Sequence, residues 1–148
     1  MSKNDYSKKI ICLADKDDDD RMMLHEALLE LNAYFEIFEV CSGEQLMDQF
    51  LKQESGVPDF IFLELCMPFT DGFGVIGSVR KILPAGKTRI VVYSSESSTS
   101  SIDQAFMAGA DFYAVKPSNY ADLKKLSRII MEARWDSLGC EQRIFHIR

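Results

Sequence analysis

The sequence predicts an α/β fold with a five-stranded parallel sheet that is doubly wound, so that helices cover both of its faces. Two observations lead to this fold. Short apolar runs rich in β-branched and aromatic residues alternate along the chain with segments of helical periodicity. Three of the runs are almost continuously apolar, which is typical of central parallel strands that are buried on both faces.

The five expected strands differ in their apolar character. The first, third and fourth are the continuous runs, whereas the second alternates between apolar and polar residues and therefore suits an edge of the sheet. The fifth is short and ends before Pro117, which keeps the preceding backbone extended. In chain order, the strands are expected at residues 9–14, 34–40, 59–65, 89–94 and 111–116.

Each expected strand is followed by a segment whose apolar residues recur every three or four positions. The first of these helices carries Leu24, Ala27, Leu28 and Leu31 on one face. The other four are expected to begin at Ser42–Glu44, after Asp71, after the serine-rich loop 94–101 and near Asn119. This alternation predicts one domain over residues 8–134, with a tail at 1–7 and an extension at 135–148.

Composition narrows the class of protein. With 47 % hydrophobic residues among 148, the chain can bury one core, and its net charge of −6 argues against nucleic acid as a partner. No apolar run approaches the roughly 18 residues of a membrane helix, and the first residues lack the apolar segment of a signal peptide. A cytoplasmic protein without a membrane partner is therefore expected. The C-terminal "RIFHIR" (143–148) is open to three interpretations: a small strand, a docking arm or a disordered end.

The four cysteines form no CxxC pair, and both histidines lie far from them in sequence, so free thiols are favoured over a zinc site. They are Cys12, Cys41, Cys66 and Cys140.

Polar residues collect where the expected strands end. Asp15, Glu64, Ser94 and Lys116 each follow an apolar run directly. In a parallel sheet, the carboxyl ends of the strands share one edge, where ligands bind, so these side chains are expected around one crevice. A carboxylate among apolar neighbours, as at Glu64, needs a cation or hydrogen-bond donors. The acidic run 17–20 fits the start of a helix, with Asp18 or Asp19 as its cap.

The order of these features resembles the receiver domain of two-component response regulators. The resemblance covers about residues 8–133 and is carried by "ICLADKDDDDR", "PDFIFLELCMPFTDGFGVI", "RIVVYSS", "AGADFYAVKP" and the closing amphipathic helix. It implies a flavodoxin-like sheet with strand order 2-1-3-4-5. It also implies phosphoryl transfer from a sensor histidine kinase or a phosphotransfer protein, with Mg²⁺ as cofactor.

The resemblance also implies a role for each matching position. Glu64 stands at the phosphoacceptor position, and the acid pair that helps to hold the metal falls on Asp15 and Lys16. The metal set would be Asp15, Glu64 and the backbone carbonyl of Cys66, with Asp17 as a substitute ligand. The groups that grip the phosphoryl oxygens and switch would be Ser94, Lys116 and the aromatic Tyr113.

Two positions depart from the family pattern. Glu64 stands in place of an aspartate and is one methylene longer, and phosphoryl transfer is sensitive to misplacement on a scale of about 1 Å. Lys16 stands in place of an acid, and an ammonium cannot ligate Mg²⁺. Together they suggest an ion-pair cluster of Asp15, Glu64, Lys16 and Lys116 that neutralises the site without metal. We therefore expect a pseudo-receiver in which Glu64 reaches Lys116 and imitates the phosphorylated state.

The sequence leaves alternative functions open. One is a receiver that is still phosphorylated with Mg²⁺. Another is a phosphatase of the haloacid-dehalogenase type, because Asp15-Lys16-Asp17 resembles its DxD motif, although a non-enzyme is favoured. A flavodoxin-like electron carrier is disfavoured, since aspartates after the first strand would repel a phosphate. No output domain is recognised after residue 134, so output is expected through contacts of the helix 4–strand 5–helix 5 face, including Met107, Tyr113 and Lys124 or Lys125.

Overall fold

A computed structural model describes residues 8–52 and 56–147 of the chain. The expected N-terminal tail, residues 1–7, lies outside the described residues. The main sheet is entirely parallel, with the order β2-β1-β3-β6-β7-β8. Its strands are β1 (Ile10–Ala14), β2 (Glu36–Val40), β3 (Phe60–Leu63), β6 (Arg89–Ser94), β7 (Phe112–Val115) and β8 (Ile144–Phe145). The predicted five-strand order is confirmed, and β8 adds a sixth strand at the β7 edge.

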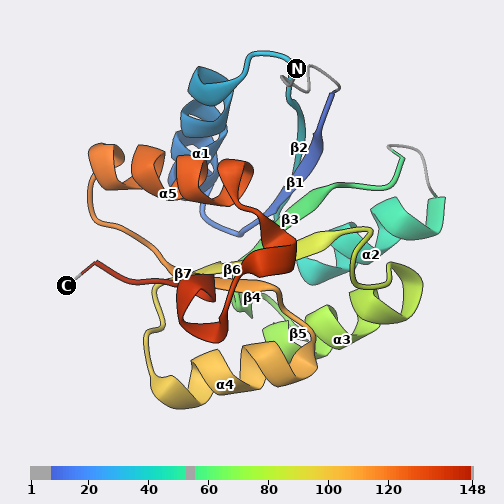
Figure 1. Cartoon of the computed structure of the whole chain (residues 1–148). Helices are drawn as coiled ribbons and strands as arrows, with labels where there is room; N and C mark the ends of the chain where they lie inside the picture. The colour runs from blue at the N-terminus through green and yellow to red at the C-terminus, as the bar shows by residue number, and fades with distance from the viewer. Residues whose placement is uncertain (1–7, 53–55, 148) are drawn as a thin grey trace.

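Within the described residues, five α-helices cover the sheet on its two faces (Figure 1). Helices α1 and α5 pack on one face, and α2, α3 and α4 pack on the other. The helices are α1 (Asp18–Leu31), α2 (Gly43–Lys52), α3 (Gly72–Ile82), α4 (Thr99–Ala108) and α5 (Tyr120–Glu132). The result is the doubly wound fold that the alternating sequence pattern predicts.

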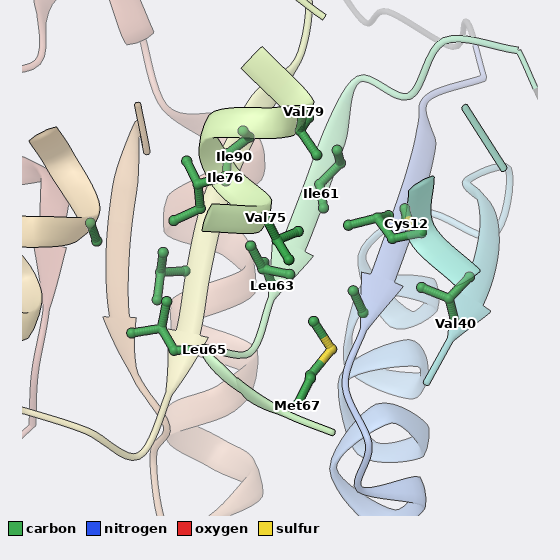
Figure 2. Close-up of a cluster of buried hydrophobic side chains, with 14 of the residues drawn as sticks. Cys12, Val40, Ile61, Leu63, Leu65, Met67, Val75, Ile76, Val79 and Ile90 are labelled. Atoms are coloured by element: carbon green, nitrogen blue, oxygen red, sulfur yellow. The ribbon is translucent and has the colours of Figure 1, made fainter. Parts of the chain in front are cut away.

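The strands are apolar throughout because each of their two faces belongs to a separate core. Along β1, Ile11 and Leu13 join the core under α1 and α5, while Cys12 and Ala14 join the opposite core. Figure 2 shows this second core, in which Val75, Ile76 and Val79 of α3 point toward Ile61 and Leu63 of β3 and Ile90 of β6. Two-sided burial therefore explains the continuous runs from which the central strands were predicted.

The helix starts are fixed by short polar side chains. Asp17 caps α1 by accepting a hydrogen bond from the Asp20 amide at 3.0 Å, so the expectation of Asp18 or Asp19 as the cap is wrong. Both of those residues already lie inside the first helical turn. At α3, Asp71 is the cap, and a Cβ on the following Gly72 would lie 2.6 Å from the Leu65 backbone. Only glycine therefore allows α3 to start so close to the segment that follows β3.

A small antiparallel hairpin of β4 (Cys66–Met67) and β5 (Thr70–Asp71) lies between β3 and α3. Phe69 at its tip has a φ of 60° and a fully exposed ring. The hairpin begins two residues after Glu64, so it carries the backbone past the carboxyl end of β3, where the sequence predicts the crevice.

The C-terminal extension folds back onto the domain. It forms two 3₁₀ turns, Trp135–Ser137 and Cys140–Arg143, before β8. The Trp135 ring lies against Phe60 and Phe112, with ring centroids 6.2 and 6.0 Å apart. Of the three interpretations of this segment, the small strand is therefore the one found.

Two further findings concern membrane-spanning helices and the state of the cysteines. No described helix is both long enough and apolar enough to cross a membrane. The four cysteines are free thiols, and burial raises the pKa of the Cys12 thiol far above its ordinary value.

Candidate functional site

The residues expected at the carboxyl ends of the strands do meet at one edge of the sheet. Asp15 directly follows β1, Glu64 follows β3, Ser94 ends β6 and Lys116 follows β7. Asp15 and Glu64 are both buried, with only 5 % and 7 % of their surface exposed. Two carboxylates removed from water in this way require a nearby cation.

Lys116 supplies that cation. Its Nζ lies 2.8 Å from Asp15 Oδ2, 2.9 Å from Glu64 Oε1 and 2.7 Å from Asp20 Oδ2. The backbone helps to place it, since the Lys116 amide donates to the Ser94 carbonyl at 2.8 Å. Burial lowers the pKa of the Lys116 ammonium, but its hydrogen bonds to the three carboxylates outweigh burial and raise that pKa above its ordinary value. Lys116 is therefore charged across the physiological range.

The membership of this cluster differs from the expected one at two positions. Lys16 is exposed and makes no ion pair within the described part of the chain. It lies in the turn between β1 and the cap of α1, and its ammonium stays in water. Asp20 takes part instead, with 37 % of its side chain exposed. Asp20 lies in the first turn of α1, and no signal in the sequence distinguished it from the other acids of the run 17–20.

Asp15 is held by the turn that follows it. Its Oδ1 accepts a hydrogen bond from the Asp17 amide at 3.0 Å, and its backbone carbonyl accepts one from the Arg21 guanidinium. Burial raises the pKa of Asp15, and the hydrogen bond from Lys116 opposes that rise. Arg21 also pairs with Asp18 and Glu39, which keeps its charge on the outer side of the site.

Glu64 uses both of its carboxylate oxygens. Oε1 contacts Lys116, and Oε2 accepts a hydrogen bond from the Cys66 amide at 3.2 Å. The Glu64 side chain thus lies between Lys116, which follows β7, and the backbone two residues ahead. The extra methylene that distinguishes glutamate from aspartate contributes to this span.

The hydroxyl groups of Ser94 and Tyr113 both form hydrogen bonds with the loop after β6. Ser94 Oγ accepts a hydrogen bond from the Glu96 amide at 3.2 Å, and the Tyr113 hydroxyl donates to the Glu96 carbonyl at 2.7 Å. Tyr113 is completely buried, and this burial, followed by the nearby Glu96 charge, raises its pKa to about 12.

Tyr113 was expected to be part of an exposed contact face, and this is wrong, because its ring belongs to the core under α4. Met107 and Lys125 are exposed as expected, and Lys124 lies 3.7 Å from Glu30 of α1.

The arrangement does not suit Mg²⁺ as it stands. The ion prefers several oxygen ligands in octahedral geometry. Asp15, Glu64 and the Cys66 carbonyl would supply oxygens, but the Lys116 ammonium already lies at the point where the carboxylates converge. Lys16 provides no oxygen in place of the second acid. In the described residues, no group of three or more histidine, cysteine, aspartate or glutamate side chains is arranged to hold a metal.

Comparison with known families gives a match to the response regulator receiver domain over residues 11–128. Among curated relatives, the two-component response regulator ORR1 of Oryza sativa subsp. indica is 26 % identical over 97 residues, which is 64 % of this chain and 42 % of that protein. The chemotaxis protein CheY of Bacillus subtilis is 29 % identical over 97 residues, which is 66 % of this chain and 76 % of that protein. The chain thus spans less than half the length of the first of these relatives.

Solved structures show the same fold. The phosphorylated cyanobacterial phytochrome response regulator RcpA matches with a TM-score of 0.76 and 25 % identity, over 90 % of this chain and 97 % of that one. A two-component response regulator from Clostridium difficile matches with a TM-score of 0.71 and 25 % identity, over 88 % of this chain and all of that one.

Proposed function

The chain belongs to the response regulator receiver domain family, and we propose that within this family it is a pseudo-receiver whose phosphorylation site is filled by its own glutamate. Its role is two-component signal transduction, in which receiver domains interact with histidine kinases or phosphotransfer proteins and with downstream targets. The proposed specialisation is that Glu64 makes, without phosphorylation, a contact that a phosphoryl group would otherwise make.

The observation that carries this proposal is the placement of the Glu64 carboxylate. It lies 2.9 Å from Lys116 and 3.2 Å from the Cys66 amide, so a negative group already lies between Lys116 and the backbone beyond the acceptor position. An incoming phosphoryl group would need the same cation, since transfer depends on neutralising the oxygen charge. A carboxylate has fewer oxygens and less charge than a phosphoryl group, so the imitation is partial.

The charge balance of the site supports function without a metal. Three carboxylates share the Lys116 ammonium. Lys16 stands at the position of the acid that would complete a magnesium site. We propose that Mg²⁺ at millimolar concentration leaves the wild-type melting temperature unchanged. The Lys16→Asp variant restores an oxygen ligand and should gain a Mg²⁺-dependent rise, because a ligand that binds only the folded state stabilises it.

Signalling by contact follows from this arrangement. Tyr113 is buried with its hydroxyl on Glu96, so the loop after β6 is held in one position while Glu64 engages Lys116. We propose that a sensor kinase or phosphotransfer protein and a downstream target recognise this fixed conformation. In this proposal the protein has no catalytic turnover of its own.

The deciding experiment is incubation with acetyl phosphate and Mg²⁺, followed by intact-protein mass spectrometry. In a competent receiver, a carboxylate oxygen attacks phosphorus, the bond to acetate breaks, and acetate leaves. The wild-type chain should show no stoichiometric adduct, whereas the double variant Lys16→Asp/Glu64→Asp should gain one. Glu64→Asp alone should gain little, because the metal ligand at position 16 is still missing. A stoichiometric adduct on wild-type Glu64 would overturn the proposal.

A second assay addresses the phosphatase alternative. Asp15 and Asp17 flank Lys16 in the DxD order, but Asp15 is paired with Lys116 and Asp17 caps α1. The wild-type chain should therefore release no chromophore from a chromogenic phosphate ester. Turnover that is abolished by Asp15→Asn would instead identify a phosphatase.

A further inference from the structure

The outer edge of β7 is covered by the chain's own C-terminal extension. Strand β8 pairs with β7 in parallel, with Ile144 opposite Tyr113 and Phe145 opposite Ala114. Figure 1 shows this red segment crossing the edge of the sheet between α5 and α4. The extension therefore occupies the middle of the face that was expected to make output contacts.

Besides the packing of Trp135, two side chains hold the β8 part of the extension in place. Phe145 is only 7 % exposed and lies in the core under α1 and α5, whereas its neighbour Ile144 is 39 % exposed. The Arg143 guanidinium donates to the Asp111 carbonyl at 3.1 Å, just before β7, and to the Trp135 carbonyl at 3.0 Å. One arginine and, two residues later, one aromatic ring thus anchor a strand of only two residues.

The charge of the occupying segment is opposite to that of the protein. Residues 141–148 contain two arginines and one acid, Glu141, while the chain as a whole carries a net charge of −6. Complementary charge favours the docking of basic segments on this protein and disfavours the association of two like-charged copies. A strand held through main-chain pairing and alternate side-chain pockets is also a common way for proteins to bind extended peptides.

We propose that the β7 edge is a docking site for an extended, basic segment of a partner protein, and that residues 143–145 occupy this site in cis until the partner displaces them. The partner segment adds in parallel to β7 and carries an arginine followed two residues later by an aromatic residue. This inference goes beyond the proposed function and does not depend on the chemistry at Glu64.

Competition with the chain's own segment makes the proposal testable. A short tether gives the attached segment an effective concentration on the order of 1 mM, so the wild-type chain should exclude a free copy. The Phe145→Asp variant places an unpaired carboxylate in a buried pocket, which should detach β8 and open the edge. The matched control is Ile144→Asp on the same strand, where the side chain is partly exposed and the segment should stay docked.

The probe is a fluorescein-labelled peptide of residues 141–148, EQRIFHIR, added to each full-length variant. Hydrogen exchange at residues 112–115 reports the edge, circular dichroism reports the fold, and fluorescence anisotropy reports binding. Phe145→Asp should keep its fold, lose protection at the edge and bind the peptide at least about tenfold more tightly than wild type or Ile144→Asp. A peptide with aspartate in place of phenylalanine should not bind.

Four results would overturn the proposal. Global unfolding of Phe145→Asp would make the extension an integral part of the core, and unchanged exchange would show that Phe145 does not anchor it. A detached extension with no peptide binding would show that the edge is not a docking site. A wild-type dimer by light scattering that dissociates in Phe145→Asp would make a second copy, and not another protein, the occupant.

Discussion

Replacement of Lys116 by methionine tests whether this ammonium is the cation that neutralises the site. Methionine retains an unbranched side chain but removes the charge that lies 2.8 Å from Asp15 and 2.9 Å from Glu64. Both carboxylates would remain buried with no other cation in contact among the described residues. We expect a large loss of stability, because the cost of removing these acids from water would no longer be offset.

The size of the loss follows from the burial of each partner. Removing one member of a buried ion pair typically lowers the free energy of unfolding by about 3–5 kcal/mol. Asp15 and Glu64 are in this class. Asp20 is 37 % exposed, and its pair with Lys116 adds only about 0.2–1 kcal/mol, as is typical of exposed pairs. The expected loss for Lys116→Met at pH 7 is therefore about 3–5 kcal/mol.

The loss should shrink as the pH falls. In the wild-type chain, burial already raises the Asp15 pKa, and Lys116 opposes that rise. Without Lys116, the Asp15 pKa rises further, so the folded variant takes up a proton at a pH where the unfolded chain does not. A folded-state pKa above the unfolded value makes the variant gain stability with decreasing pH, by up to about 1.4 kcal/mol per pH unit and proton. The wild-type contribution of Lys116 stays complete over this range, because the Lys116 pKa is raised above its ordinary value.

Urea unfolding followed by far-UV circular dichroism at pH 7 and pH 5 measures both effects. The matched control is Lys16→Met, because Lys16 is exposed and makes no ion pair in the described part of the chain, so its stability should stay within about 0.5 kcal/mol of wild type. A Lys116→Met loss below about 1 kcal/mol at pH 7 would refute the reasoning. So would a loss of equal size at both pH values.

Three further predictions address single features of the structure. Asp20→Asn should cost less than about 1 kcal/mol in the same urea assay, since 37 % of the Asp20 side chain is exposed, and a loss as large as that of Lys116→Met would contradict this. Gly72→Ala should lower stability by about 1–3 kcal/mol, because its Cβ would lie 2.6 Å from the Leu65 backbone; Gly77→Ala, with open space around the Cβ, is the control. In a titration at 295 nm, Tyr113→Phe should remove one phenol that ionises near pH 12, because burial favours the neutral ring, and removal of a component near pH 10 would argue against it.

Much of the fold could be predicted because burial leaves a direct trace in the sequence. Strands β1, β3 and β6 are covered on both faces and are therefore continuously apolar, which located them correctly. The edge that carries Asp15, Glu64 and Lys116 followed from the geometry of parallel strands, and the structure brings these three side chains into contact.

The parts that could not be predicted depend on single side-chain directions. Lys16 and Asp20 both lie near the end of β1, and charge alone does not tell which one points into the site. The cap at Asp17 decides it, because a helix that starts at residue 18 leaves Lys16 in the exposed turn and brings Asp20 round to Lys116. The strand β8 has only two residues, too short for a periodic pattern to identify, and its pairing depends on a pocket formed by distant residues.

The two proposals meet on strand β7. Its carboxyl end leads directly into Lys116, which is held by three carboxylates, and its Tyr113 is paired with Ile144 of the extension. If Glu64 supplies a permanent negative charge at the acceptor position, phosphorylation cannot switch this protein on and off. Regulation must then act on a contact that can be made and broken, and the two-residue pairing of β8 with β7 is such a contact. On this reasoning, the conformational change that other receivers draw from a phosphoryl group would come here from the exchange of the extension for a partner's strand.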